Sequence, residues 1–116
     1  MQELVKTIVS AIDDKKGKNI VSLDLSGIDG AVCDAFVVCN ADSTTQVSAI
    51  ADSVVEKVQR ELGEKPHRIE GQTASLWVAI DYVDVMVHVF LTPLRDFYRL
   101  EQLWADAPET RYRSEE

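Results

Sequence analysis

Four aspartates are the residues of this 116-residue chain best suited to metal chemistry, because paired carboxylates hold magnesium and orient phosphates. They are Asp24, Asp34, Asp81 and Asp84. The other parts of a nucleotidyl-transfer site are missing from the sequence: no Gly-Ser pair opens a phosphate-binding helix, no strand carries Asp-x-Asp, and no Gly-x-x-x-x-Gly-Lys loop occurs. No Lys or Arg lies between Arg68 and Arg95 to neutralise a triphosphate. We therefore expect no metal site, no cofactor and no catalytic residue.

The two cysteines and two histidines are a second set of candidates, for zinc binding or for a nucleophilic pair. Cys33 and Cys39 form no Cys-x-x-Cys motif, and with only His67 and His88 beside them no zinc spacing appears. A Cys–His pair is assembled in space, so spacing alone leaves this chemistry open. Both cysteines lie next to or inside an apolar run that predicts a buried strand. We interpret them as reduced, buried and structural.

The charge balance favours one class of partner over another. The chain has 20 acids and 12 bases, for a net charge of −8, and no Lys or Arg occurs between Lys18 and Lys57. Contact with RNA or DNA depends on Lys and Arg that neutralise phosphates. We expect little or no direct nucleic-acid contact and a basic protein partner instead. The alternative is that the net acidity only keeps the chain soluble.

Length and composition are those of one globular domain. At 116 residues, with 46% hydrophobic and 28% charged residues, the chain can build its own core. No apolar run approaches the ~20 residues that span a bilayer, and Met1 begins no secretory pattern, so we expect a cytoplasmic protein without membrane contact. We expect a single α+β domain over residues 1–106 and a mobile polar tail over 107–116.

Periodicity places the elements of the first half. Apolar residues at spacings of three and four predict a helix over 2–15, and β-branched runs predict strands over 20–25 and 35–39, the second buried on both faces. Ser43 and Gln46 form a capping-box pattern before a second apolar stripe, and Gly63 ends that helix.

The second half predicts a brief edge strand over 67–70, a hairpin over 76–91 and a last helix. Thr92 can cap this helix with Pro93 at its first position, and its apolar stripe is Phe97, Leu100 and Trp104. The order of elements predicts an α+β fold in which helices pack on a mixed sheet of four or five strands.

The hairpin has two faces of different character. Even positions are aliphatic in the first run and odd positions in the second, and a two-residue loop at Tyr82 and Val83 brings both sets onto one face. The predicted pairs are Asp81 with Asp84, Ala79 with Met86, and Trp77 with His88. The second face then carries Trp77, Asp81, Asp84, Met86, His88 and Phe90.

Two interpretations of the second face remain open. Directly opposed carboxylates cost roughly 0.2 to 1 kcal/mol unless a cation lies between them, which suits a basic partner. In the alternative, a helix covers this face, Trp77 belongs to the core, His88 is a satisfied polar group and the aspartates sit in water at the turn.

One series of motifs runs through the chain: Asp34, Phe36, Glu70-Gly71, Trp77, Asp81-Tyr82, Asp84, Val87-His88-Val89-Phe90, Arg95, Phe97-Tyr98, Leu100-Glu101 and Leu103-Trp104. These motifs resemble the ribosomal silencing factor family, also called the Iojap family and written RsfS in bacteria. The resemblance covers nearly the whole chain, from the first helix to Pro108. It departs from the usual pattern at Val83, where the family has Gly, and near Ala41, where a Gly is usual.

The resemblance implies a nucleotidyltransferase-like fold that has lost its catalytic motif. It also implies binding to the large ribosomal subunit through protein L-fourteen, a steric block of small-subunit joining, and lower translation when nutrients are scarce. By position, Trp77 would be the aromatic anchor and Asp81 with Asp84 the acids that meet basic side chains. The other implied partner-binding residues are Met86, His88, Arg95 and Tyr98.

Alternatives to these roles and to this function stay open. Arg95 can instead pair with a carboxylate of the sheet, with Tyr98 packed on the sheet's end. The chain can be a small nucleotidyltransferase or nucleotide-binding enzyme. It can also be a module that forms a homodimer through the Trp77 face when it is off the ribosome.

Overall fold

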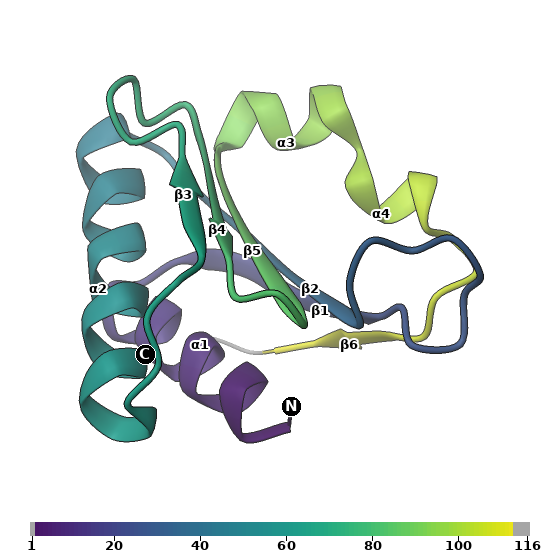
Figure 1. The fold of residues 1–116 in the computed structure, drawn as a ribbon. Helices are drawn as coiled ribbons and strands as arrows, with labels where there is room; N and C mark the ends of the chain where they lie inside the picture. Colours follow the sequence, from purple (N-terminus) through teal and green to yellow (C-terminus); the bar gives the residue numbers. More distant parts are fainter. Residues whose placement is uncertain (1, 113–116) are drawn as a thin grey trace.

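A computed structural model describes residues 2–112, except the side chains of Phe97, Tyr98, Leu100 and Glu101. The helices and strands alternate in short blocks along the chain (Figure 1). In order, they are α1 (Gln2–Asp14), β1 (Lys18–Asp24), β2 (Ala35–Ala41), α2 (Thr44–Leu62), β3 (Arg68–Glu70), β4 (Trp77–Asp81), β5 (Val85–Leu91), α3 (Thr92–Tyr98), α4 (Leu100–Leu103) and β6 (Glu109–Arg111).

The strands form one mixed sheet in the order β3-β4-β5-β2-β1-β6. β2 and β5 pair in parallel at its centre, and the other neighbours are antiparallel. All seven residues of β2 are buried, as expected for a strand covered on both faces. The predicted α+β class and mixed sheet are confirmed, but the predicted four or five strands are wrong, because the sheet has six.

The sixth strand lies in the segment that we expected to be a mobile tail. Residues 109–111 pair antiparallel with β1, and the flanking bonds from Asp24 N to Pro108 O and from Tyr112 N to Ile20 O are each 2.9 Å long. Ala107 is buried, and Tyr112 packs against the main core, which is the cluster of buried side chains between the sheet and helices α1 and α2. The expectation of a mobile tail is therefore wrong for residues 107–112. Residues 109–111 are polar and show no strand pattern in the sequence, because backbone groups make most of their pairing with β1.

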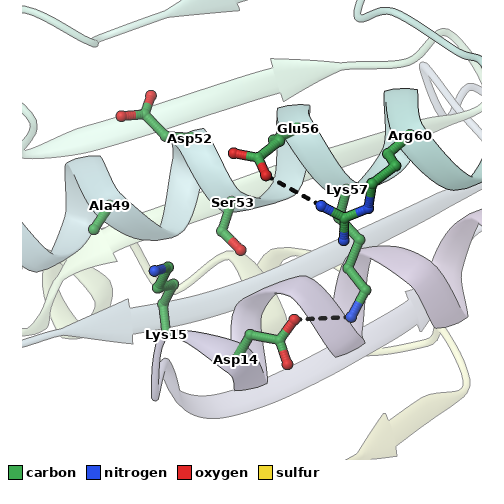
Figure 2. A pocket seen from close by; sticks show the side chains of 8 residues that line it. All are labelled: Asp14, Lys15, Ala49, Asp52, Ser53, Glu56, Lys57 and Arg60. Carbon is green, nitrogen blue, oxygen red and sulfur yellow. Dashed lines mark hydrogen bonds and ion pairs between the residues drawn. The ribbon is translucent and has the colours of Figure 1, made fainter.

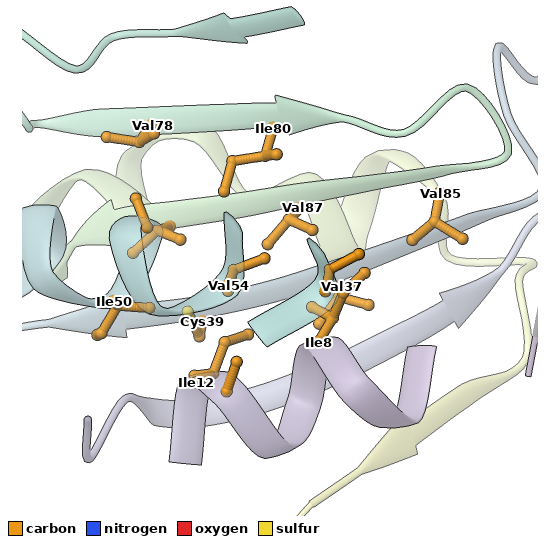
Figure 3. Packing of buried hydrophobic residues seen from close by; sticks show 14 of the residues in the cluster. Ile8, Ile12, Val37, Cys39, Ile50, Val54, Val78, Ile80, Val85 and Val87 are labelled. Atoms are coloured by element: carbon orange, nitrogen blue, oxygen red, sulfur yellow. The ribbon is translucent and has the colours of Figure 1, made fainter. Parts of the chain in front are cut away.

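Helices cover both faces of the sheet. α1 and α2 lie on one face and are joined to each other by Lys57, whose Nζ donates to Asp14 Oδ2 over 2.8 Å (Figure 2). Their apolar stripes meet the aliphatic face of β2, β4 and β5 in the main core (Figure 3). α3 and α4 lie on the other face (Figure 1). Both aliphatic sets of the hairpin share the main core, as the alternation predicts, although Leu76 and Val83 are exposed.

The ends of α2 follow the predicted capping. The Ser43 side chain accepts a hydrogen bond from Gln46 N at 3.1 Å, and Gly63 ends the helix in the left-handed region at φ 69°. The Gln46 side chain does not complete the box. Its Nε2 donates instead to the carbonyl oxygens of Lys15 and Lys16, which fixes the end of α1 against the start of α2.

The last helix differs from its prediction in its N-cap and in a break at Arg99. Its N-cap is Leu91 and not Thr92, whose hydroxyl lies 3.0 Å from Ala41 O and 2.7 Å from Asp42 Oδ1. The predicted single helix is broken at Arg99, which has φ 51° and separates α3 from α4. Trp104 follows the end of α4, and the side chains of Phe97 and Leu100 lie outside the described part of the structure.

Candidate partner-binding surface

The β4–β5 turn sets the positions of the predicted contact residues that lie in the hairpin. The observed pairs are Trp77 with Phe90, Ala79 with His88, and Asp81 with Met86. The predicted register is therefore wrong, and Asp81 does not oppose Asp84. The loop residues are Val83 and Asp84, not Tyr82 and Val83, since Tyr82 N donates to Val85 O over 2.9 Å. The observed pairs keep an odd sum, so each side chain stays on its predicted face.

Hydrogen bonds around Val83 explain the register. The Asp81 side chain accepts from Val83 N at 2.7 Å, and Asp84 N donates to Tyr82 O over 2.9 Å, which closes a γ-turn centred on Val83. Val83 consequently adopts φ 74°. A β-branched residue rarely takes this conformation, which costs on the order of 1–3 kcal/mol, whereas Gly adopts it freely.

The two predicted acids lie at the tip of the hairpin. Asp84 is exposed and Asp81 half-buried. The Asp84 carbonyl oxygen accepts two bonds, from Asp34 N at 2.8 Å and from Ala35 N at 3.1 Å. These bonds fix the end of the loop over residues 26–34 beside the hairpin tip. The acids remain neighbours in the chain and in space, but they do not form the opposed pair on which the expected repulsion depended.

Trp77 is held in place by His88. The two side chains come from diagonal positions on β4 and β5, and the indole Nε1 donates to His88 Nδ1 over 3.0 Å. The indole also stacks on Phe90, with ring centroids 4.9 Å apart. Trp77 itself is half-buried. An aromatic side chain that is both fixed and partly exposed can serve as a preorganised contact.

His88 is buried and does not reach the surface. It is 5% exposed and makes an edge-to-face contact with Phe36, with the two ring centroids 4.7 Å apart. Burial lowers the pKa of His88 to about 4, so the imidazole is neutral at pH 7. Since Nδ1 accepts from Trp77, the proton of the neutral ring is on Nε2. Among the described residues, no hydrogen-bond partner reaches this buried Nε2.

Arg95 is likewise buried, at 8% exposed. Its guanidinium donates to Asn40 Oδ1 over 2.9 Å and to the carbonyl oxygen of Asn19, whose own φ is 51°. Asn40 in turn donates to Thr92 Oγ1 over 2.8 Å. This network joins the start of α3 to β1 and β2. Tyr98 lies in α3, but its side chain is outside the described part.

The second face of the hairpin is partly covered. Phe36 and Phe90 are buried there, and Trp77, Met86, Leu94 and Trp104 pack around them as half-buried residues. The structure therefore agrees in part with each of the two interpretations, the exposed partner-binding face and the face covered by a helix. Leu94 of α3 and Trp104, which follows α4, pack against the cluster that contains Phe90, while Trp77, Met86 and the acids of the tip retain exposed surface.

The two cysteines differ in exposure. Cys39 is buried as expected, and burial raises its pKa to about 12. Cys33 is half-exposed, contrary to its prediction, because it lies in the loop before β2 and not in the strand. Burial raises the pKa of Cys33, and the negative charges of Asp81 and Asp34 raise it further. The loop thus brings Asp34 and Cys33 to the hairpin tip, which local sequence patterns did not indicate.

A cavity of about 400 Å³ lies elsewhere, between α1 and α2 (Figure 2). Positively and negatively charged side chains balance each other in its lining. Arg60 Nη1 lies 3.1 Å from Glu56 Oε1, and Lys57 Nζ also donates to Ser10 Oγ over 2.7 Å. Such a lining gives no excess of positive charge for a phosphate. Within residues 2–112, no cluster of three His, Cys, Asp or Glu side chains could hold a metal ion. None of the described helices is long and apolar enough to cross a membrane.

Comparisons with known proteins agree on one family. The sequence model described as "Ribosomal silencing factor during starvation" matches residues 1–116. The chain is 45% identical to a ribosomal silencing factor RsfS of Halalkalibacterium halodurans, over 92% of this chain and 90% of the relative. It is 39% identical to the RsfS of Bacillus subtilis, over 92% and 89%. A crystal structure of a Chromobacterium violaceum protein superposes with a TM-score of 0.85 at 39% identity, over 90% of this chain and 86% of that one.

Proposed function

The chain belongs to the ribosomal silencing factor family, and from this membership we propose that it is a non-enzymatic repressor of translation. It acts in the cytoplasm by binding the large ribosomal subunit through protein L-fourteen. The bound protein then occupies the side on which the small subunit docks and blocks subunit joining sterically.

One observation carries the proposed contact surface: Trp77 is half-exposed, is fixed by its bond to His88, and lies on the same face as Met86 and the acidic hairpin tip. A fixed aromatic side chain contributes contact area with little loss of conformational freedom on binding. Acids beside it steer and orient a basic protein partner. A partner of this charge also fits the net charge of −8.

The buried residues take supporting roles in this proposal. His88 orients Trp77, and Arg95 holds α3 against the sheet, so neither touches the partner in the described conformation. Direct contacts are assigned to Trp77, Asp81, Asp84 and Met86. Tyr98 keeps its proposed role through its position in α3 alone.

Co-sedimentation with separated ribosomal subunits tests the proposal. The protein should migrate with the large subunit and remain free in the presence of the small one. Co-migration with the small subunit alone would defeat the proposal. Loss of binding to large subunits that lack protein L-fourteen would support the assigned partner.

The enzymatic alternative is tested separately. Binding or turnover of nucleoside triphosphates with magnesium at micromolar protein would favour a nucleotidyltransferase or nucleotide-binding enzyme. Light scattering across a concentration series, with and without large subunits, shows whether a homodimer forms and competes with ribosome binding.

A further inference from the structure

Val83 combines a strained backbone with a mostly exposed side chain. Its φ is 74° in the γ-turn, a conformation that favours Gly, and its side chain is 62% exposed. Packing within the protein therefore offsets little of the strain. Residues held in such conformations gather at functional sites, so contact with a partner can account for an exposed valine here.

A second exposed valine lies on the adjacent loop. Val32 is 74% exposed and precedes Asp34, whose backbone N–H donates to Asp84 O over 2.8 Å. The bond from Ala35 N to the same oxygen, at 3.1 Å, fixes the end of this loop a second time. These two bonds hold the end of the loop, two residues after Val32, beside the hairpin tip.

Acids outnumber bases at this surface, although Arg68 pairs with Asp81 on the neighbouring strand β3. Asp34 and Asp84 are exposed and Asp81 is half-buried. Burial is the main cause of the raised pKa of the Cys33 thiol. The negative charges of Asp81 and Asp34 raise this pKa further, so both carboxylates act on the surface at Cys33. No Lys or Arg occurs in residues 19–56 or 69–94, which include the loop and the hairpin.

We propose that Val32 and Val83 form the apolar centre of a protein-docking surface and that Asp34, Asp81 and Asp84 form its charged rim. We call these five residues the tip surface. Its occupant is a protein of the large subunit that presents aliphatic side chains beside Lys or Arg. The inference rests on the proposed function and adds the loop over residues 26–34 to the contact.

The same features disfavour two other occupants. RNA phosphates would meet three carboxylates, and Arg68, which pairs with Asp81 across β3 and β4, has its guanidinium 3.4 Å from a Glu70 carboxylate oxygen. Binding would therefore gain little of the counterion release that drives such contacts. A second copy of the chain in a two-fold dimer would place the acidic rim against its own equivalent, which repels. An apolar centre with an acidic rim is the common anatomy of a site for a basic protein.

Val83→Gly separates folding from binding. The substitution relieves the strained φ, so the melting temperature of the free protein should rise by a few degrees. It also removes the aliphatic contact, so affinity for the large subunit should fall about tenfold. A variant that is more stable and yet binds more weakly is the expected signature. Unchanged affinity would overturn the role of Val83.

Val32→Ser tests the loop, and Leu76→Ser is its control. Leu76 is 44% exposed and precedes the opposite end of β4, away from the tip surface. Val32→Ser should lower affinity several-fold with no change in melting temperature, while Leu76→Ser should bind as the parent does. Equal affinity of all three proteins would overturn the inference. If Trp77→Ala still lost binding, the proposed function would stand without this extension.

A photo-reactive residue at position 32 identifies the occupant. In complexes with intact large subunits it should form adducts with a ribosomal protein and not with RNA. Adducts only with RNA, or only with a second copy of the chain, would overturn the proposed occupant. A parent protein that fails to bind large subunits at all would instead defeat the proposed function.

Discussion

Trp77 donates a hydrogen bond from Nε1 to Nδ1 of the buried His88, and this bond links the proposed contact surface to a titratable group. Protonation of Nδ1 would remove the acceptor and place a charge among Phe36 and Phe90. The orientation of Trp77 therefore depends on a neutral His88. The pKa of about 4 keeps the ring neutral at any pH near 7.

We predict that this histidine destabilises the protein as the pH falls. Its pKa is about 4 in the folded state, against 6.5 as the ordinary value, so the unfolded state binds more protons between these limits. The contribution to stability is complete above pH 6.5 and is lost as the pH falls toward 4, by up to about 3 kcal/mol. Chemical unfolding at a series of pH values measures it.

A matched pair of variants isolates this effect from that of the carboxylates. His88→Gln should flatten the fall between pH 6.5 and 4, whereas the exposed His67→Gln should keep the slope of the parent. Equal slopes for all three proteins would show that His88 titrates alike in the folded and unfolded states.

Arg95→Met should destabilise the protein by about 2 to 3 kcal/mol, because it removes charge-assisted bonds from the carbonyl of Asn19 and from the buried Asn40. The control is Arg99→Met, since Arg99 is exposed and its substitution should stay within about 0.5 kcal/mol. Urea unfolding measures both. Equal effects of the two substitutions would mean that the buried network contributes nothing specific.

The cysteines should differ in their reaction with iodoacetamide. Cys39 is buried with a pKa of about 12, and Cys33 is half-exposed with a raised pKa. At pH 8 the folded protein should react slowly at Cys33 and not at Cys39, because the thiolate is the nucleophile. Mass spectrometry with and without urea gives the rates. Rapid labelling of Cys39 without urea would contradict the packing of β2.

Truncation after Asp106 should lower stability by about 2 kcal/mol or more, because it removes β6 and the contacts of Ala107 and Tyr112 with the two cores. The matched control ends after Tyr112 and so keeps β6. Thermal unfolding compares the two. If both truncations unfold like the parent, β6 adds nothing to the sheet, and a tail beginning at Ala107 would be the better description.

Local pattern predicted most of the fold but not the details of its turns. The stripes of α1 and α2, the buried β2 and the faces of the hairpin follow from periodicity, since burial forces the spacing. The hairpin register did not follow. Val83 adopts a conformation that its residue type disfavours, and bonds from Asp81 and Asp84 determine it.

Contacts between residues far apart in the sequence were the second feature that local pattern did not predict. Sequence alone placed Trp77 and Met86 on the same face, but it could not show that Leu94 of α3 packs against the cluster of Phe90 or that Arg95 reaches Asn19. The parallel pairing of β2 with β5 brings Asp34 next to Asp84, and no local pattern encodes that contact. The acidic loop was therefore missing from the predicted site.

In the proposed mechanism, the Trp77 face binds the large subunit and blocks joining of the small subunit. The most direct measurement is the fraction of joined ribosomes in a gradient of mixed subunits, with the parent protein or with Trp77→Ala. The parent should reduce joining, and Trp77→Ala, with affinity lower by roughly 2 kcal/mol or more, should restore it at equal concentration. Joining that is unaffected by the parent, or blocked equally by a folded Trp77→Ala protein, would show that the Trp77 face does not block subunit joining.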